Sequence, residues 1–222
     1  CNAYNLIDGI DGQAGTQALA VFIFLAGFLL HSIYATNVLE EKSFFADANF
    51  WMIAFVAIIG SIAGFLVFNW QPAKIFMGDT GSLFIGTLIA LSIIMSMNYS
   101  GADPILIYDY EIKAKILVFP MFFFLPFADT LRVFVSRIRR GKSPFSADKT
   151  HIHHFLLRTG YSHQRTAITN FVIQAIVSII SIIIAFFISD IYYILYIIAM
   201  WFIYVFTLRY TIQRKIAKLK QD

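Results

Sequence analysis

The sequence predicts an all-α protein that crosses a membrane several times. Hydrophobic residues make up 59% of its 222 residues, only 14% are charged, and the mean hydropathy is +0.73. Soluble domains are about half apolar and about one quarter charged, so this composition excludes an ordinary soluble protein. Backbone inside a bilayer must satisfy its own hydrogen bonds, and a helix of about 20 apolar residues does so across the hydrocarbon core.

Six apolar windows have this length and carry charges only near their ends. They cover residues 14–35, 50–69, 82–98, 116–135, 167–189 and 191–208. Each window predicts a transmembrane helix, so the chain is expected to be one polytopic membrane domain over residues 1–222. The chain begins at Cys1 without an initiator Met or a signal-like segment, so we expect it to be part of a longer protein.

The distribution of basic residues predicts how the chain is oriented. Six spans put four segments on one side of the membrane: 1–13, 70–81, the loop 136–166 and the tail 209–222. Of the 17 Lys and Arg residues, only Lys42, Lys113 and Lys115 fall on the other side. The positive-inside rule therefore predicts that the four segments are cytoplasmic. The basic tail is expected to touch anionic lipid.

Two carboxylates precede the first predicted span, in the run Asn5-Leu-Ile-Asp8-Gly-Ile-Asp11-Gly. Asp8 and Asp11 are three residues apart, and the glycines keep the backbone open, so the pair can approach a metal or a polar ligand at a helix entrance. Asp11 is equally compatible with a simple role as the N-cap of that span.

A second polar cluster lies between the second and third spans. It contains Asn69, Lys74, Phe76 and Asp79. The third span starts near Thr80 with its amides facing the cytoplasm, which favours phosphate binding, while Lys74 can contact a phosphate oxygen and Asp79 can hold a hard cation. Asp79 as a helix cap is the alternative, but a cap leaves the other three residues unexplained.

The loop 136–166 contains a single acid, Asp148, among many cations, which predicts an anion site. The cations are Arg137, Arg139, Arg140, Lys142, Lys149, Arg158 and Arg165. Residues 148–160 predict a short helix, capped by Asp148 or Thr150 and ended by Gly160. Helical spacing would put His151, His154 and Arg158 on one face.

Two further features of this region have alternative interpretations. Three histidines within four positions, His151, His153 and His154, are compatible with zinc, but no H-E-x-x-H pattern is present and the surrounding positive charge opposes a dication. Asp129, close to membrane depth, is a functional candidate or a partner for Arg132.

Three runs of sequence resemble the polyprenyl-phosphate N-acetylhexosamine 1-phosphate transferases of the MraY/WecA/TagO superfamily. They are N-A-Y-N-L-I-D-G-I-D-G at 2–12, F-M-G-D-T-G-S at 76–82 and S-P-F-S-A-D-K-T-H-I-H-H at 143–154. The H-I-H-H run resembles the WecA/TagO-like branch, whose members use undecaprenyl phosphate and GlcNAc 1-phosphate. The resemblance covers nearly the whole chain.

The resemblance implies a helical fold of about ten or eleven spans in the inner (plasma) membrane, of which this chain would be the C-terminal part. It also implies transfer of GlcNAc 1-phosphate, or a related N-acetylhexosamine 1-phosphate, from a UDP-sugar to the lipid phosphate with release of UMP. That reaction would initiate a cell-envelope or surface glycan. The expected partners are the UDP-sugar, the polyprenyl phosphate and the membrane, with no nucleic acid; a homodimer is a further option.

The resemblance also assigns roles to residues. Asp79 would bind Mg²⁺ or Mn²⁺, with Asp8 and Asp11 as catalytic residues that shape the metal and nucleotide pocket together with Asn5. Asn69 and Phe76 would hold the uridine, Phe76 by stacking on the base. The remaining residues would clamp the diphosphate and the sugar: Lys74, Arg137, Arg139, Arg140, Asp148, His151, His153, His154 and Arg158.

Two other functional classes remain open at this point. The family's paired-aspartate motif is absent from the chain, so this piece alone is expected to be inactive, and an inactive membrane scaffold is one alternative. A lipid or anion transporter is the other alternative. It would require polar residues along the spans near the middle of the membrane, and we expect these spans to contain few of them.

Overall fold

A computed structural model of the chain describes residues 2–35, 42–100, 106–107, 110–111, 115–144 and 150–219. Within these ranges the regular structure is helical except for one antiparallel pair of two-residue strands, β1 (Leu106–Ile107) and β2 (Tyr110–Glu111). The all-helical class is therefore confirmed. The helices are α1 (Asn2–Asn5), α2 (Gln13–Ala35), α3 (Lys42–Asn69), α4 (Gly78–Ser100), α5 (Lys115–Met121), α6 (Phe124–Arg139), α7 (Ile152–Arg158), α8 (His163–Phe187) and α9 (Asp190–Leu219).

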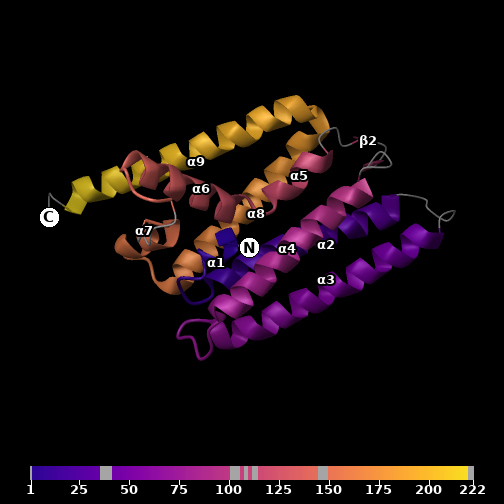
Figure 1. The fold of residues 1–222 in the computed structure, drawn as a ribbon, viewed down its shortest axis with the longest axis horizontal. Helices are drawn as coiled ribbons and strands as arrows, with labels where there is room; N and C mark the ends of the chain where they lie inside the picture. The colour runs from indigo at the N-terminus through magenta and orange to yellow at the C-terminus, as the bar shows by residue number, and fades with distance from the viewer. Residues whose placement is uncertain are drawn as a thin grey trace.

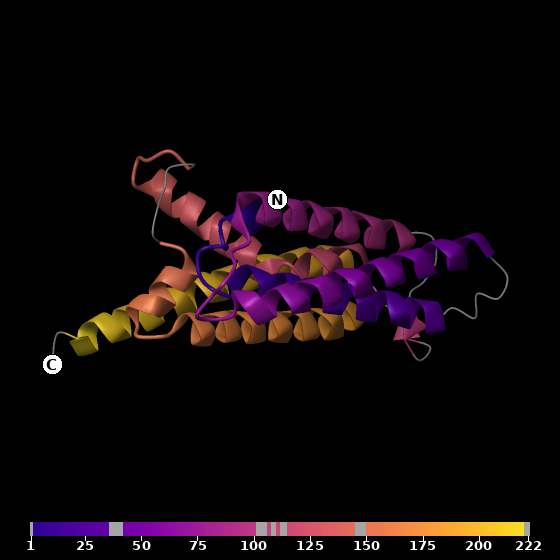
Figure 2. The ribbon, with the colours of Figure 1, turned by 90° about the horizontal axis from the view of Figure 1, so that it is seen from below.

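The long helices lie side by side in an elongated bundle (Figure 1). α7 and the loop between α3 and α4 lie at one end of the bundle, whereas β2 lies at the other. Seen at right angles, α6 projects obliquely from the bundle on the same side as α7 (Figure 2). The three polar sequence motifs therefore share one end of the molecule, as the alternation of spans predicted.

Five described helices are long and apolar enough to cross a membrane, which confirms a polytopic membrane protein. The candidate spans are Gln13–Leu30, Ala48–Asn69, Gly78–Ser96, His163–Phe187 and Asp190–Thr211. The span in α2 has 67% of its residues buried, whereas the other four have 33% or less. α2 is therefore the central helix, and it packs against α3 on one side and α8 on another.

The prediction of one continuous span over residues 116–135 is wrong. The segment forms two helices, α5 and α6, interrupted at Phe122 and Phe123. Pro126 explains part of the interruption, because it has no N–H to donate to a carbonyl in the preceding turn and its ring disfavours helical geometry before it. Pro120, inside α5, weakens the helix on the other side of the break.

The polar groups at the break are bound by Gln174 of α8. Its side-chain oxygen accepts a hydrogen bond from the Leu125 backbone N–H at 2.8 Å, and its side-chain nitrogen donates to the Met121 carbonyl at 2.9 Å. Gln174 is fully buried. Non-helical backbone at membrane depth is stable only where such partners replace the missing helical bonds.

Gln174 belongs to a buried polar row on α8, so the expectation of few polar residues along the spans is wrong. The row follows the helical repeat and consists of Thr166, Asn170, Gln174, Ser178 and Ser181. Asn170 donates to the Gln13 side chain of α2 at 3.1 Å, and the Tyr193 hydroxyl of α9 donates to the Ser181 carbonyl at 3.0 Å. These bonds join helices, as polar residues commonly do inside membranes.

We predict that Gln174→Leu destabilises the bundle by about 2–4 kcal/mol, because it leaves the Leu125 N–H and the Met121 carbonyl buried without partners. Thermal unfolding of the detergent-solubilised protein would measure the loss. Val172→Leu is the matched control, since Val172 is on the same helix and 45% exposed. Equal melting temperatures for the two variants would contradict the assignment.

Candidate active site

The first and second motifs are joined by a direct contact between Asn5 and the start of α4. The Asn5 amide donates to Asp79 Oδ1 at 3.0 Å and to Ser82 Oγ at 2.8 Å. Tyr4 anchors the short α1 beneath them, because its buried hydroxyl donates to the Ala14 carbonyl at 2.7 Å. Asp79 lies in the first turn of α4, where the helix N-terminus favours anionic groups.

Asp8 lies near enough to Asp79 for the two carboxylates to interact. Burial, and to a smaller extent the charge of Asp79, raise the pKa of Asp8 to about 6. A bound cation would relieve both effects, and Mg²⁺ is usually held by one or two carboxylates together with water and phosphate oxygens. Asp8, Asp79 and the Asn5 side chain fit that requirement, although the described residues form no group of three or more His, Cys, Asp or Glu side chains around one point.

Asp11 points elsewhere. Its carboxylate accepts a hydrogen bond from the Ala73 N–H at 3.3 Å and lies 3.5 Å from His163 Nδ1 of α8. In the part of the chain that the structure describes, no hydrogen bond joins Asp11 to the first turn of α2, so the N-cap interpretation is not what the structure shows. Asp11 instead holds the 70–77 loop against the start of α8.

Asn69 holds the same loop from the other side. Its side-chain oxygen accepts from the Gly12 N–H at 2.9 Å, and its nitrogen donates to the Ile75 carbonyl at 2.8 Å. Gly12 has φ +75°, and a Cβ there would approach the Trp70 ring to 3.1 Å, so only glycine suits this position. Both ends of the Asn69 amide are thus engaged within the protein, while Lys74 and Phe76 are exposed. Uridine binding by Asn69 and Phe76 stays a prediction.

The third motif contacts the first through His153. A Cβ placed on Gly9 would lie 2.6 Å from His153 Nε2, so the imidazole rests directly on the D-G-x-D-G backbone. His153 is only 1% exposed, and burial, followed by the neighbouring His154 and His151, lowers its pKa to about 4. His153 is therefore neutral at pH 7 and suited to hydrogen bonding rather than to charge attraction.

Asp129 fixes the position of the histidine motif. Its buried carboxylate accepts hydrogen bonds from Arg132 Nη2 at 2.6 Å, from the Ile152 N–H at 3.2 Å and from the Tyr204 hydroxyl at 2.9 Å. His151 Nδ1 lies 2.8 Å from its second oxygen. Of the two interpretations of Asp129, the pairing with Arg132 is therefore observed, but it is one contact among four.

The short helix predicted over 148–160 begins later, because α7 starts at Ile152. His151 is the N-cap residue without a capping side-chain bond, and the carboxylate of Asp129 binds the Ile152 N–H instead. His151 is buried toward Asp129 and does not share an outer face with His154 and Arg158. Gly160, with φ +86°, follows the helix end as predicted, and Asp148 lies outside the described residues.

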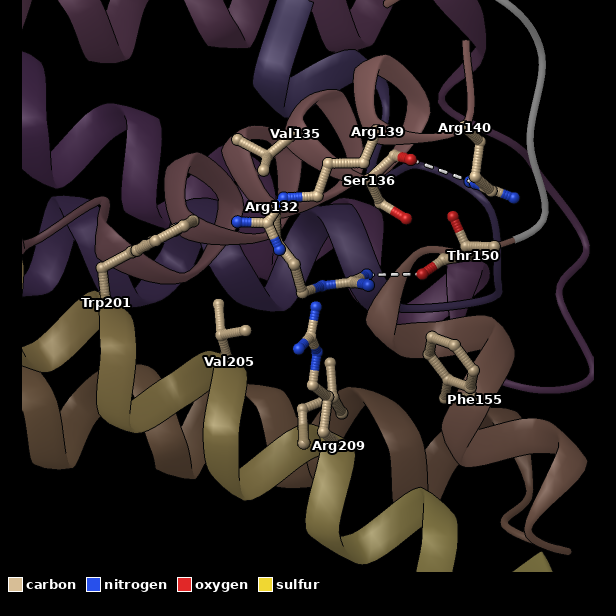
Figure 3. Close-up of a pocket in the computed structure, with 11 residues that line it drawn as sticks. Arg132, Val135, Ser136, Arg139, Arg140, Thr150, Phe155, Trp201, Val205 and Arg209 are labelled. Atoms are coloured by element: carbon tan, nitrogen blue, oxygen red, sulfur yellow. Dashed lines mark hydrogen bonds between the residues drawn. The ribbon is translucent and has the colours of Figure 1, made fainter. Parts of the chain in front are cut away.

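The predicted arginines divide between two places. Arg137 is buried, donates to the Pro144 carbonyl and lies over the Phe134 ring. Arg139 and Arg140 are exposed and line a cavity on the α9 side of α6, shown in Figure 3. A joint clamp formed by the histidines and all these arginines stays a prediction.

Two residues of the site were not predicted from the sequence, and only one of them carried a usable signal. Tyr204 reaches Asp129 from 75 residues away and stands in an apolar span without any distinguishing pattern. Ser82 binds Asn5 and belongs to the quoted 76–82 run, so its place in the motif was the available signal.

We predict that Asp129→Asn lowers the free energy of unfolding by about 3–5 kcal/mol, since Arg132 would keep a largely buried charge without its anion. Thermal unfolding reports the loss of stability, and limited proteolysis between α6 and α8 reports the release of α7. Asp190→Asn is the control, because Asp190 is an exposed carboxylate at the start of α9. An unchanged melting temperature for Asp129→Asn would refute the central role of this residue.

Comparisons with known proteins identify a family model and several relatives that this chain matches. Residues 1–97 match the family model described as Glycosyl transferase family 4. The chain is 34% identical over 178 residues to a decaprenyl-phosphate N-acetylglucosaminephosphotransferase of Mycobacterium leprae. This alignment covers 75% of the chain and 41% of the relative. It is 35% identical over 189 residues to a probable undecaprenyl-phosphate N-acetylglucosaminyl 1-phosphate transferase of Bacillus subtilis, which covers 82% of the chain and 44% of the relative.

A third relative is an undecaprenyl-phosphate alpha-N-acetylglucosaminyl 1-phosphate transferase of Yersinia pestis, with 30% identity over 183 residues, 82% of the chain and 44% of the relative. The chain thus spans less than half the length of the relatives it matches. The aligned part nevertheless includes at least 75% of the chain. The chain belongs to glycosyl transferase family 4, the MraY/WecA superfamily.

Proposed function

We propose that the protein containing this chain transfers an N-acetylhexosamine 1-phosphate, with GlcNAc as the preferred sugar, from a UDP-sugar to a polyprenyl phosphate. An oxygen of the lipid phosphate attacks the phosphorus next to the sugar. A new P–O bond forms, the bond to the uridylyl oxygen breaks, and UMP leaves with the electron pair. The names of the relatives supply the substrate class, and undecaprenyl phosphate is the proposed acceptor.

The observation that carries this proposal is the convergence of three motifs at the N-terminus of α4. Asn5 binds Asp79, Asp8 interacts with Asp79, and His153 rests on Gly9 next to Asp8. Phosphoryl transfer depends mainly on positioning and on neutralising charge. This arrangement supplies carboxylates for a cation, a helix N-terminus and the neutral imidazole of His153.

We propose that Asp8 and Asp79 hold Mg²⁺, or Mn²⁺ in its place. The bound ion would neutralise charge on the diphosphate. Asn5 orients Asp79 through its amide, and Ser82 fixes Asn5 in turn. Asp11 and Asn69 position the loop that presents Lys74 and the exposed ring of Phe76, which would stack on the uracil base. Arg158 and His154 would meet the sugar phosphate from α7.

The site is proposed to face the cytoplasm from the plasma membrane. UDP-sugars are made in the cytoplasm, and the positive-inside rule places the motifs on that side. The product, a sugar joined to a lipid by a diphosphate, would start a cell-envelope or surface glycan. A transporter would move an anion or a lipid without forming UMP, so product analysis separates the two functions.

We predict that Asp79→Asn lowers UMP release by at least about 100-fold, because one of two proposed metal ligands loses its charge. The complete gene product would be assayed with UDP-GlcNAc, polyprenyl phosphate and a range of Mg²⁺ concentrations, with Asp190→Asn as the control. Wild-type rates for Asp79→Asn at every Mg²⁺ concentration would exclude it as a metal ligand. Consumption of UDP-GlcNAc by the wild type without release of UMP would exclude the transfer reaction.

We predict that Gly9→Ala also lowers UMP release, by about 10- to 100-fold, because the added methyl group collides with His153 and moves its imidazole. Gly60→Ala is the matched control, since a Cβ on Gly60 meets nothing within 4 Å. A rate for Gly9→Ala equal to that of Gly60→Ala would show that the position of His153 is irrelevant to turnover.

A further inference from the structure

The cavity between α6, α7 and α9 is separate from the motif carboxylates and is strongly basic. Its volume is about 390 Å³, and α6, α7 or α9 supplies most of its walls. The lining residues are Arg132, Val135, Ser136, Arg139, Arg140, Thr150, Phe155, Trp201, Val205, Leu208 and Arg209. Figure 3 shows Arg132 from α6 and Arg209 from α9 reaching into the space between the two helices. None of the eleven lining residues is acidic.

Several hydrogen bonds fix the walls of this cavity. Arg132 is held by Asp129 and donates to the Thr150 carbonyl, while Arg140 Nε donates to the Ser136 carbonyl at 3.1 Å. Trp201 donates its indole N–H to the Ala128 carbonyl at 3.3 Å, which joins α9 to α6. The cavity is therefore a built feature of the helix crossing.

The charge in this cavity is incompletely balanced. Asp129 neutralises Arg132 from behind, but Arg139 and Arg209 form no ion pair with any carboxylate in the described part of the chain. Guanidinium groups bind phosphate with two parallel hydrogen bonds, so two such groups facing one cavity favour a phosphate-type anion.

The remaining lining residues indicate where this anion comes from. Trp201, Val205 and Leu208 form an apolar wall on α9, and Arg209 lies two residues before the end of the candidate span Asp190–Thr211. The neighbouring residues Phe202 and Phe206 are 60% and 72% exposed, as expected for a helix side that faces lipid. At the end of the span, the arginines suit the phosphate of a lipid headgroup, and the apolar wall next to them suits the first methylene groups of the lipid.

We propose that this cavity binds the phosphate-bearing headgroup of an anionic membrane phospholipid. Arg139 and Arg209 contact the phosphate, and the α9 wall contacts the glycerol region. The bound lipid supplies the anion that the cavity lacks and connects α6 to α9. The proposal uses neither Asp8 nor Asp79, and it assigns Arg139 to the lipid phosphate instead of to the diphosphate clamp expected from the resemblance.

Native mass spectrometry of the complete, detergent-solubilised protein tests the proposal, with phosphatidylglycerol and phosphatidylcholine as the two probes. The wild type should retain phosphatidylglycerol in preference to phosphatidylcholine. Arg209→Gln should weaken this retention about tenfold through the loss of one charge-assisted contact. Arg214→Gln is the matched control, because Arg214 is exposed on the same helix outside the cavity, and it should retain the lipid as the wild type does.

Three results would overturn the proposal. Equal losses for Arg209→Gln and Arg214→Gln would show unspecific attraction to basic residues. Equal retention of both lipids would show that headgroup charge is irrelevant. Displacement of phosphatidylglycerol by millimolar inorganic phosphate, with saturable phosphate binding of its own, would assign the cavity to a soluble anion. Val205→Trp fills the cavity without removing charge, so it should weaken retention even if Arg209→Gln proves unstable.

Discussion

The carboxylate of Asp129 is the point on which the functional end of the molecule depends. It is fully buried, and a buried charge is stable only when it is paired and hydrogen-bonded. Arg132 and Tyr204 meet one of its oxygens, and His151 meets the other. Asp129 thereby joins α6, α7 and α9.

A second constraint comes from the interrupted segment between α5 and α6. Hydropathy averages over a window, so two short helices in line give the same signal as one continuous span. The interruption lets α6 leave the bundle at an angle (Figure 2). Asp129 and Arg132 of α6 contact Ile152 and Thr150 at the start of α7. Gln174 stabilises the interruption in an apolar environment by binding the Leu125 N–H and the Met121 carbonyl. Because this compensation comes from a helix about 50 residues later in the chain, no local pattern in 116–135 could have indicated it.

The sequence was sufficient to predict the helical class, five of the six spans and the gathering of three motifs at one end. Apolar length and alternation of sides determine these features directly. It was insufficient for the direction of individual side chains. Helical spacing put His151 on the outer face with Arg158, yet Asp129 draws His151 inward and replaces the predicted cap of α7. Similarly, the count of arginines in 136–166 could not show that Arg137 is buried while Arg139 faces a cavity beside α9.

Arg132 and Asp129 lie between the two sites and connect them. Asp129 orients His151 and the start of α7, and His153, two residues later, contacts Gly9 in the first motif. On the opposite side, Arg132 lines the basic cavity. An anion bound by Arg139 and Arg209 would add negative charge beside the Arg132–Asp129 ion pair. The ion pair thus links the basic cavity to the histidine motif, which contacts Gly9 of the first motif.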